Sequence, residues 1–595
     1  MRLWEELKSW GSRLTQRTWS WGVQLRQAAK PRLLLGKLLR GWVPGALVVL
    51  LFSAGVLHAS FRASDRYYDR RMVAADSSCY LVGPALVVSG KDDFGLRDLL
   101  HDPSPFEATD HGTSIYVLQT FTAWYLRDFL PLRPAMAVLL NGVWFIGMGV
   151  SVYALFWSHM RRWLTAALAT MGFLLANPFL TSTTYGLTSL DPNLVGFMLG
   201  TSALCWVILS DRFERFVPCA LAGLSLGALA LGRVYTLGVV LPAMLPFVLA
   251  CFWRRSREQI VLSLAGGVIV VAMAYVVCGW WVLKHWREVL DYPTQFGTWG
   301  VMNSMTPTAG FFEWLYFPRL AFSKTLALIC VLTWPFAAAV LAPGRGFWRF
   351  NWAALWLIVC PMLVLARLGT TFKPYGAVLL LGVFLVLLFP FKPSRPELVT
   401  RGRYGAALWI ACALSMWAFF FEQRVTHDGH ANNKRGIKTA LEAMRQHAID
   451  AGRRRVKLGL IHWGVLHDAS LIDTLVFDLG VRVATSNFQP SHRARKSSFI
   501  VDPLAVDVWA WEPKISGAAS VTPESWAKRL VEEADYVLVL AGSRTQERRK
   551  GRWPPWTETS DRVRASGAFE RLGAQFGIPN DGPMELLVRK KAARR

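Results

Sequence analysis

Charged residues are scarce in this chain, and acidic residues are scarcer than basic ones. Only 18% of the 595 residues are Asp, Glu, Lys or Arg, whereas 53% are hydrophobic. A globular protein of this length would carry more charge, because roughly a quarter of the residues in an average soluble domain are charged. The apolar residues come in blocks of about 18–24, the length that crosses a bilayer core of roughly 30 Å. The composition excludes a soluble multidomain protein and predicts a polytopic α-helical membrane protein.

Several common site motifs are also missing. The eight Cys show no CxxC or Cys/His spacing, and seven of them lie in apolar blocks, which excludes a disulfide framework. No GxGxxG, P-loop or nucleophile elbow occurs in the polar tail. The net charge of +26 could indicate nucleic-acid binding. Much of that excess sits in short loops between apolar blocks, where Lys and Arg set orientation, so we expect no nucleic-acid partner.

The apolar blocks divide the chain into three regions. Residues 1–41 hold nine Lys or Arg and four Trp, which predicts a basic amphipathic segment on the cytoplasmic face. Residues 42–421 form the membrane domain, with a large first outer loop at 61–133. We expect about eleven transmembrane helices: 42–60, 135–157, 164–180, 194–210, 216–232, 235–252, 259–282, 320–342, 352–367, 374–391 and 404–421. The break between 216–232 and 235–252 depends only on Gly232 and Arg233.

The loop charges orient these spans. With the N-terminus inside, the inside loops hold 13 Lys or Arg and the short outside loops hold six. The positive-inside rule supports this orientation, which places the first loop and the tail outside. The tail, 422–595, contains the strand-like segments "RRVKLGLIHW", "ADYVLVLAG" and "PMELLVRK" and, at 468–480, the segment "DASLIDTLVFDLG" with helix spacing. Strands that alternate with helices predict a soluble α/β domain. We therefore expect an integral protein of a bacterial inner (plasma) membrane whose C-terminal domain is periplasmic.

Titratable residues avoid the spans and gather at the outer rim. No Asp or Glu lies in the middle of any predicted span, which argues against an ion channel or a proton-coupled transporter. A site at the rim, facing both lipid and water, fits a lipid-linked substrate. The charged groups at this rim are Asp65, Asp69, Asp76, Asp110, His111, Asp191, Arg233, Arg367 and Lys373.

One outer-loop pattern is more specific. Asp76, Tyr80, Ala85 and Gly90 form D-x(3)-Y-x(4)-A-x(4)-G just after the first span. This resembles the first outer loop of integral-membrane glycosyltransferases of the GT-C fold that use dolichyl- or polyprenyl-phosphate sugars, the group of ArnT-, PMT- and RgtA-like enzymes. The later segments "DHGTSIYVLQTF" and "TTFKPYGAVLLLG" are similar to other loops of these enzymes. The resemblance covers residues 42–391.

The resemblance implies an inverting transfer of a hexosyl or pentosyl group from a polyprenyl-phosphate donor to an acceptor hydroxyl on a glycan, lipid or protein. Asp76 would be the general base, and Tyr80 would line the donor site. The expected acceptor-orienting or metal-supporting residues are Asp110, His111 and Asp69. The expected ligands of the donor phosphate are Lys373, Arg367 and Arg233.

Several alternatives stay open. Asp65 or Asp69 could be the base in place of Asp76, and Pro84 restricts a helix that starts at Asp76. The sequence specifies no cofactor with certainty, and use of a divalent metal stays open. Other functions that suit a rim site are an O-antigen ligase or polymerase that uses a lipid diphosphate, and a non-enzymatic flippase or scaffold for lipid-linked glycans.

Overall fold

The residues described by the computed structural model are 42–68, 81, 84, 87–88, 117–160, 163–176, 187, 190, 192–253, 255–302, 356–357, 359–361, 363, 381, 434–460, 474–479, 481–485, 504–510, 523–540, 556–578 and 582–590. The predicted spans after residue 303 fall outside these residues, apart from a few single positions. The total of eleven spans therefore stays a prediction.

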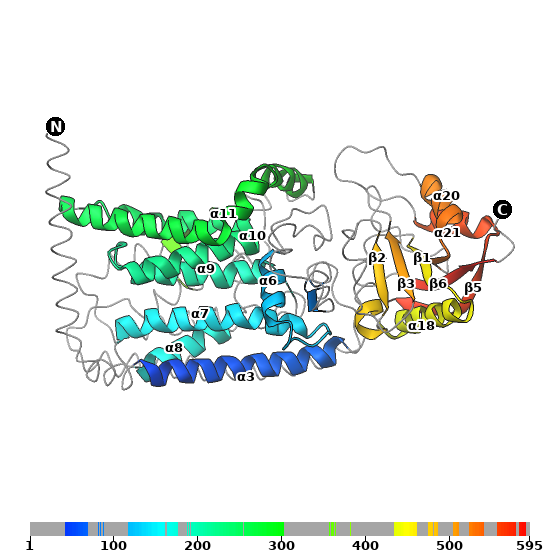
Figure 1. The fold of residues 1–595 in the computed structure, drawn as a ribbon, viewed down its shortest axis with the longest axis horizontal. Helices are drawn as coiled ribbons and strands as arrows, with labels where there is room; N and C mark the ends of the chain where they lie inside the picture. The colour runs from blue at the N-terminus through cyan, green and yellow to red at the C-terminus, as the bar shows by residue number, and fades with distance from the viewer. Residues whose placement is uncertain are drawn as a thin grey trace.

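The N-terminal half is a bundle of apolar helices that lie side by side, with one short helix, α6, across their ends (Figure 1). The helices are α3 (Val43–Tyr68), α6 (Val117–Leu126), α7 (Met136–Met160), α8 (Trp163–Ala176), α9 (Pro192–Leu209), α10 (Phe216–Ala250) and α11 (Arg257–Met302). Helices suit an apolar surrounding because they satisfy every backbone polar group internally. Among the described residues, four segments are long and apolar enough to cross a membrane: Val43–Asp65, Met136–Ser158, Phe216–Arg233 and Arg257–Lys284.

Helix α10 folds back on itself at Arg233. That residue has φ −162° and ψ 85°, which is extended and not helical backbone. Near one end of α10, the Cys219 thiol donates to the Phe213 carbonyl at 3.6 Å; at the other end, the Cys251 thiol donates to the Arg212 carbonyl at 3.4 Å. Both ends of α10 therefore meet the same turn. The break predicted at Gly232 and Arg233 is confirmed, and α10 is a pair of antiparallel helical arms.

Glycines bring the two arms close to their neighbours. A Cβ on Gly227 would lie 2.7 Å from the carbonyl oxygen of Ala274, so the first arm contacts the backbone of α11. A Cβ on Gly200 would lie 2.8 Å from Cγ2 of Val240, so the second arm packs on α9. Small residues are the usual means of close helix packing in membranes, where apolar burial alone gives little attraction between helices.

The bundle has two distinct ends. We call them the Arg233 end, where α10 folds back, and the Ser210 end, where the turn 210–215 joins α9 to α10. At the Ser210 end, Asp211, Arg212 and Phe213 all have positive φ, at 50°, 66° and 63°. The Ser210 hydroxyl accepts a hydrogen bond from the Phe213 amide at 3.0 Å and donates to the Val207 carbonyl at 2.6 Å.

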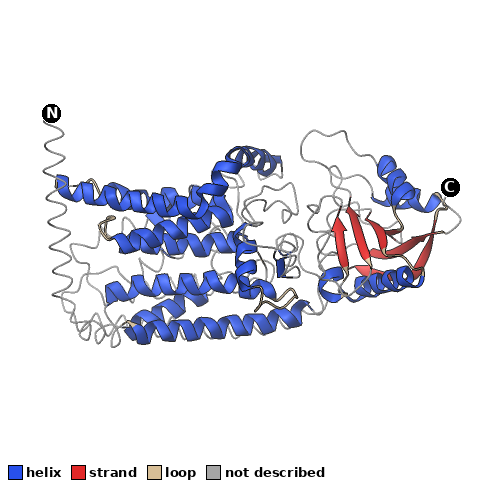
Figure 2. Cartoon of the chain, viewed as in Figure 1, coloured by secondary structure: helices blue, strands red, loops and turns tan. Residues whose placement is uncertain are grey.

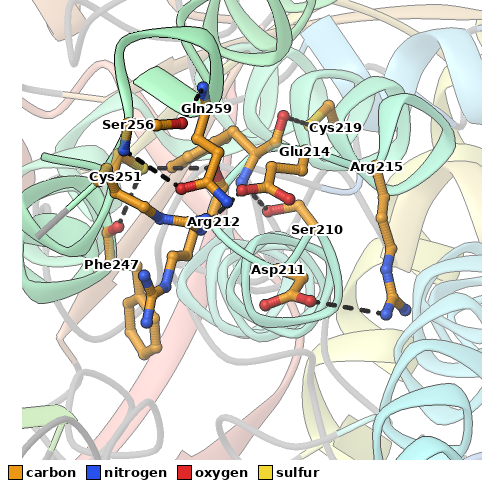
Figure 3. A network of polar contacts seen from close by, with 12 residues as sticks. Ser210, Asp211, Arg212, Glu214, Arg215, Cys219, Phe247, Cys251, Ser256 and Gln259 are labelled. Carbon is orange, nitrogen blue, oxygen red and sulfur yellow. Dashed lines mark hydrogen bonds and ion pairs between the residues drawn. The ribbon is translucent and has the colours of Figure 1, made fainter. Parts of the chain in front are cut away.

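Polar contacts from other segments surround this turn (Figure 3). Arg255 and Glu214 form an ion pair at 2.6 Å, with only 11% and 26% of their side chains exposed. Ser256 and Gln259 bond reciprocally, side chain to backbone amide, at 3.4 and 3.3 Å, which caps the start of α11. These contacts hold four helix ends around one strained turn: the end of α9, both ends of α10 and the start of α11.

The C-terminal part contains a six-stranded sheet with helices on both faces (Figure 2). The strand order is β2-β3-β1-β4-β6-β5; β1 to β4 pair in parallel, and β6 pairs antiparallel with β4 and β5. The elements are α18 (Lys434–Asp450), β1 (Arg455–Leu460), the π-helical turn η4 (Thr474–Asp478), β2 (Arg482–Thr485), β3 (Ala505–Ala510), α20 (Pro523–Glu533), β4 (Tyr536–Leu540), α21 (Trp556–Ala565), β5 (Phe569–Ile578) and β6 (Gly582–Arg589).

Side-chain alternation shows which helix covers which face of this sheet. Tyr536 lies opposite Leu458 in the β4/β1 pair, and its hydroxyl is hydrogen-bonded to Nδ1 of His447 on α18 at 2.8 Å. Gly459 points to the other face, where it meets Leu530 of α20. Tyr536, Val537, Leu538 and Val539 of β4 are all buried, as expected for a strand that is covered on both faces.

Tyr536 should make the sheet sensitive to high pH. Burial raises the pKa of its hydroxyl to about 12. Between pH 10 and 12 the unfolded chain has released this proton and the folded chain still holds it, so the free energy of unfolding falls as pH rises. The Tyr536→Phe variant should lose about 1 kcal/mol at neutral pH, from the lost hydrogen bond, and should show a shallower alkaline decline. Thermal unfolding of the full chain in detergent from neutral pH to about pH 12 measures both effects. If the free energy of unfolding of Tyr536→Phe falls with rising pH as steeply as that of the native chain, Tyr536 is not the cause of the alkaline decline.

Candidate functional site

A buried cation lies at the Arg233 end of the bundle. Arg233 is only 4% exposed and sits where the two arms of α10 meet. A Cβ on Gly196 of α9 would lie 3.2 Å from Cβ of Arg233 and 2.5 Å from the hydroxyl oxygen of Thr236. A guanidinium has five N–H donors in a planar fork, which matches carboxylate and phosphate oxygens. Among the residues predicted for the donor phosphate, Arg233 is the one whose surroundings the structure describes.

Helix α6 packs against both the fold-back of α10, next to Arg233, and α11. Figure 1 shows α6 lying across the ends of the longer helices. A Cβ on Gly232 would lie 3.0 Å from the Leu118 side chain, so the first turn of α6 meets the fold-back of α10. Further along α6, Phe121 packs edge-on against Trp280 of α11, with ring centroids 5.9 Å apart. The segment between α3 and α7 thus places a helix against the fold-back of α10 that carries the buried cation.

Two buried amides hold α6 against α7. The Gln119 amide donates to Oδ1 of Asn141 at 3.3 Å, and Asn141 in turn donates to the Leu187 carbonyl at 3.2 Å. Gln119 is 4% exposed and Asn141 is fully buried. Neither residue was among those predicted from the sequence. A neutral Asn in the apolar run of α7 is the signal that could have identified them, since buried amides in membranes usually bond across helices.

The stretch that follows Asp76 packs at the same end. Leu81, Pro84, Val87 and Val88 are helical and buried, and their spacing of three or four residues is that of one helix face. Leu81 and Val88 belong to one buried apolar cluster with residues of α6, the start of α7 and Leu190. Pro84 is therefore compatible with helix in this segment.

Asp65 has an identified partner in the structure. Its carboxylate forms an ion pair with Arg133 at 3.0 Å, and the Arg133 guanidinium also lies over the ring of Phe61 at 4.9 Å. These contacts tie the end of α3 to the segment before α7. They give Asp65 a structural role and weaken it as the alternative base.

The remaining predicted site residues lie outside the described residues. They are Asp69, Asp76, Tyr80, Asp110, His111, Arg367 and Lys373. Within the part of the chain that the structure describes, no group of three or more His, Cys, Asp or Glu is placed to hold a metal ion.

No protein-family model matches the chain, and no curated protein is similar to it in sequence. The structure does resemble the apo crystal structure of ArnT from Cupriavidus metallidurans. The TM-score is 0.50 at 13% sequence identity, over 91% of this chain and 98% of that one. The chain has the GT-C fold. The fold expected from the residues around Asp76 is therefore confirmed, and the likeness extends beyond residues 42–391.

Other structures with the GT-C fold give lower scores. ArnT from the same organism bound to undecaprenyl phosphate matches with a TM-score of 0.49 at 14% identity, over 91% of this chain and 98% of that one. The archaeal oligosaccharyltransferase AglB from Archaeoglobus fulgidus, in complex with an inhibitory peptide and a dolichol-phosphate, matches with a TM-score of 0.41 at 12% identity. This match covers 91% of this chain and 75% of AglB.

Proposed function

We propose that this chain is an integral-membrane glycosyltransferase that moves a sugar from a polyprenyl-phosphate donor to an acceptor hydroxyl. The observation that carries the proposal is Arg233, a guanidinium buried at one end of a helical bundle with the GT-C fold. A buried cation there suits an anionic lipid head group that enters from the side of the bundle. The proposed site is the Arg233 end, facing the periplasm.

The lipid class is proposed by analogy with ArnT, which has been solved with undecaprenyl phosphate bound. The chemistry of the site agrees with that class. A phosphate monoester or diester oxygen accepts charge-assisted hydrogen bonds from a guanidinium fork, and these are about twice as strong as neutral ones. Lys373 and Arg367 would be further ligands of the same phosphate.

In the proposed reaction the acceptor oxygen bonds to the anomeric carbon as the bond from that carbon to the phosphate oxygen breaks. The acceptor proton goes to Asp76, and the sugar configuration inverts because the displacement is single. Polyprenyl phosphate leaves with the bonding electron pair, and Arg233 stabilises the charge that develops on it. Asp110, His111 and Asp69 would orient the acceptor, and Tyr80 would line the donor site.

Loss of the Arg233 charge should weaken lipid binding. We expect Arg233→Gln to lower the affinity for undecaprenyl phosphate by about 10- to 100-fold, because a charge-assisted hydrogen bond to a desolvated phosphate is lost. Arg233→Lys should retain part of that affinity. Binding of the lipid to the full chain in nanodiscs measures the effect.

The matched control for Arg233 is Arg133→Gln. Arg133 lies at the same end of the bundle, but it is paired with Asp65 and 48% of its side chain is exposed. Its substitution should leave the lipid affinity within about twofold of native. Native affinity in a folded Arg233→Gln protein, shown by an unchanged melting temperature, would overturn the proposed role.

A further inference from the structure

Two oxygen atoms in the first turn of α6 are buried without a hydrogen bond. Among the residues that the structure describes, Oε1 of Gln119 and Oγ1 of Thr120 have no partner. Gln119 and Thr120 are 4% and 2% exposed. Proteins leave few buried polar atoms in this state, since an acceptor removed from water without a replacement bond is destabilising. Thr122, on the same helix, differs because its hydroxyl donates to the Leu118 carbonyl at 2.8 Å.

The Gln119 side chain is held in place by its other end. Its amide nitrogen donates to Asn141, and Asn141 is anchored by the Leu187 carbonyl. Gln119 therefore cannot turn its oxygen toward another helix without breaking a bond between α6 and α7. Asn141 acts as a positioning residue that fixes the orientation of the Gln119 oxygen.

The same turn of α6 lies beside the buried cation. Leu118 precedes Gln119 and contacts Gly232, which precedes Arg233. The contact packs the turn of α6 that carries these neutral acceptors against the fold-back of α10 that carries the guanidinium, so both lie at the Arg233 end. A guanidinium binds phosphate oxygens, and neutral acceptor oxygens accept hydrogen bonds from hydroxyl groups. Together the two kinds of group match a ligand that is a polyol attached to a phosphate.

We propose that Gln119 and Thr120 form the subsite that binds hydroxyl groups of the donor sugar, with Arg233 binding the phosphate next to it. This inference rests on the proposed function and adds the residues that recognise the sugar. A site with buried groups that require a hydroxyl partner discriminates strongly against ligands that lack it. Gln119 and Thr120 would therefore set the preference of the enzyme for the sugar-bearing lipid over the bare lipid phosphate.

The test compares binding of two probes to the full chain in nanodiscs. One probe is undecaprenyl phosphate, and the other is the same lipid carrying glucose, mannose or arabinose, whichever the native chain binds most tightly. Gln119→Leu and Thr120→Val remove the polar groups with little change of volume. Each should reduce the preference for the sugar-bearing lipid by about tenfold or more and keep the affinity for the bare lipid within about twofold.

Thr122→Val is the matched control, because its hydroxyl is satisfied within α6; both affinities should stay native. If Gln119→Leu lowers the amount of folded protein, the conclusion is drawn from Thr120→Val only. A native preference in folded Thr120→Val, or equal losses for both probes, would overturn the inference. So would a native chain that binds every sugar-bearing lipid no better than the bare lipid. Failure of the native chain to bind bare undecaprenyl phosphate would instead overturn the proposed function.

Discussion

The Asp76→Asn variant is expected to lose sugar transfer by about 10²- to 10⁴-fold, the usual contribution of a general base. An acceptor hydroxyl is a weak nucleophile, and it attacks the anomeric carbon effectively only if its proton is removed as the new bond forms. Asparagine keeps the shape of the side chain but cannot accept that proton. Affinity for undecaprenyl phosphate should remain near native, because in the proposed mechanism the base contacts the acceptor and not the phosphate.

Asp65→Asn is the matched control for this variant. Asp65 is the same residue type near the same end of the bundle, but its carboxylate is paired with Arg133 at 3.0 Å. Its loss should lower stability slightly and leave the turnover number within about threefold, since an ion pair that is partly exposed contributes roughly 1 kcal/mol or less. The measurement is the release of undecaprenyl phosphate from a sugar-bearing lipid in proteoliposomes. Near-native turnover by Asp76→Asn, or a large loss of turnover in Asp65→Asn, would show that Asp76 is not the general base.

The Gly266→Ala variant is expected to lose about 3 kcal/mol of stability or more, and with it most of the folded protein. A Cβ on Gly266 would collide with the backbone oxygen of Phe213. Neither partner can move easily. Phe213 is the last of three consecutive residues with positive φ, and its carbonyl also accepts a bond from the Cys219 thiol.

Gly267→Ala is a close control for this effect, because a Cβ at Gly267 would meet nothing within 4 Å. Both variants gain the same helix propensity, so the difference between them isolates the collision at the Ser210 end. The measurement is the melting temperature of each full-length variant in detergent, with the yield of monodisperse protein. Equal melting temperatures for the two variants would show that the turn adjusts to the added methyl group.

The elements that the sequence predicted well are those with a strong local signal. The fold-back of α10 was visible because a lone Arg separates two apolar runs, and the same feature identified Arg233 as a site candidate. The segments "RRVKLGLIHW" and "ADYVLVLAG" contain β1 and β4, because strands that are buried on both faces are short apolar runs. β5 was not predicted, since Gly573 and exposed polar residues interrupt its alternation.

The missed features depend on contacts between distant segments. Gln119 and Asn141 are neutral residues 22 positions apart, and only the fold brings their amides together. The pairing of Asp65 with Arg133 is likewise absent from any local pattern, so the choice among Asp65, Asp69 and Asp76 stayed open. The segment 468–480, expected to be helical, contains the π-helical turn at Thr474–Asp478, which periodicity alone does not distinguish from an α-helix.

The most direct test of this account is an experimental structure of the full chain in nanodiscs with a non-hydrolysable donor analogue, a sugar joined to undecaprenyl phosphonate. The account predicts that the phosphonate contacts the Arg233 guanidinium at about 2.7–2.9 Å. It also predicts that Asp76 lies on the side of the anomeric carbon opposite the phosphonate, with room for one acceptor hydroxyl. A head group bound at the Ser210 end, or an Asp76 carboxylate remote from the anomeric carbon, would contradict it.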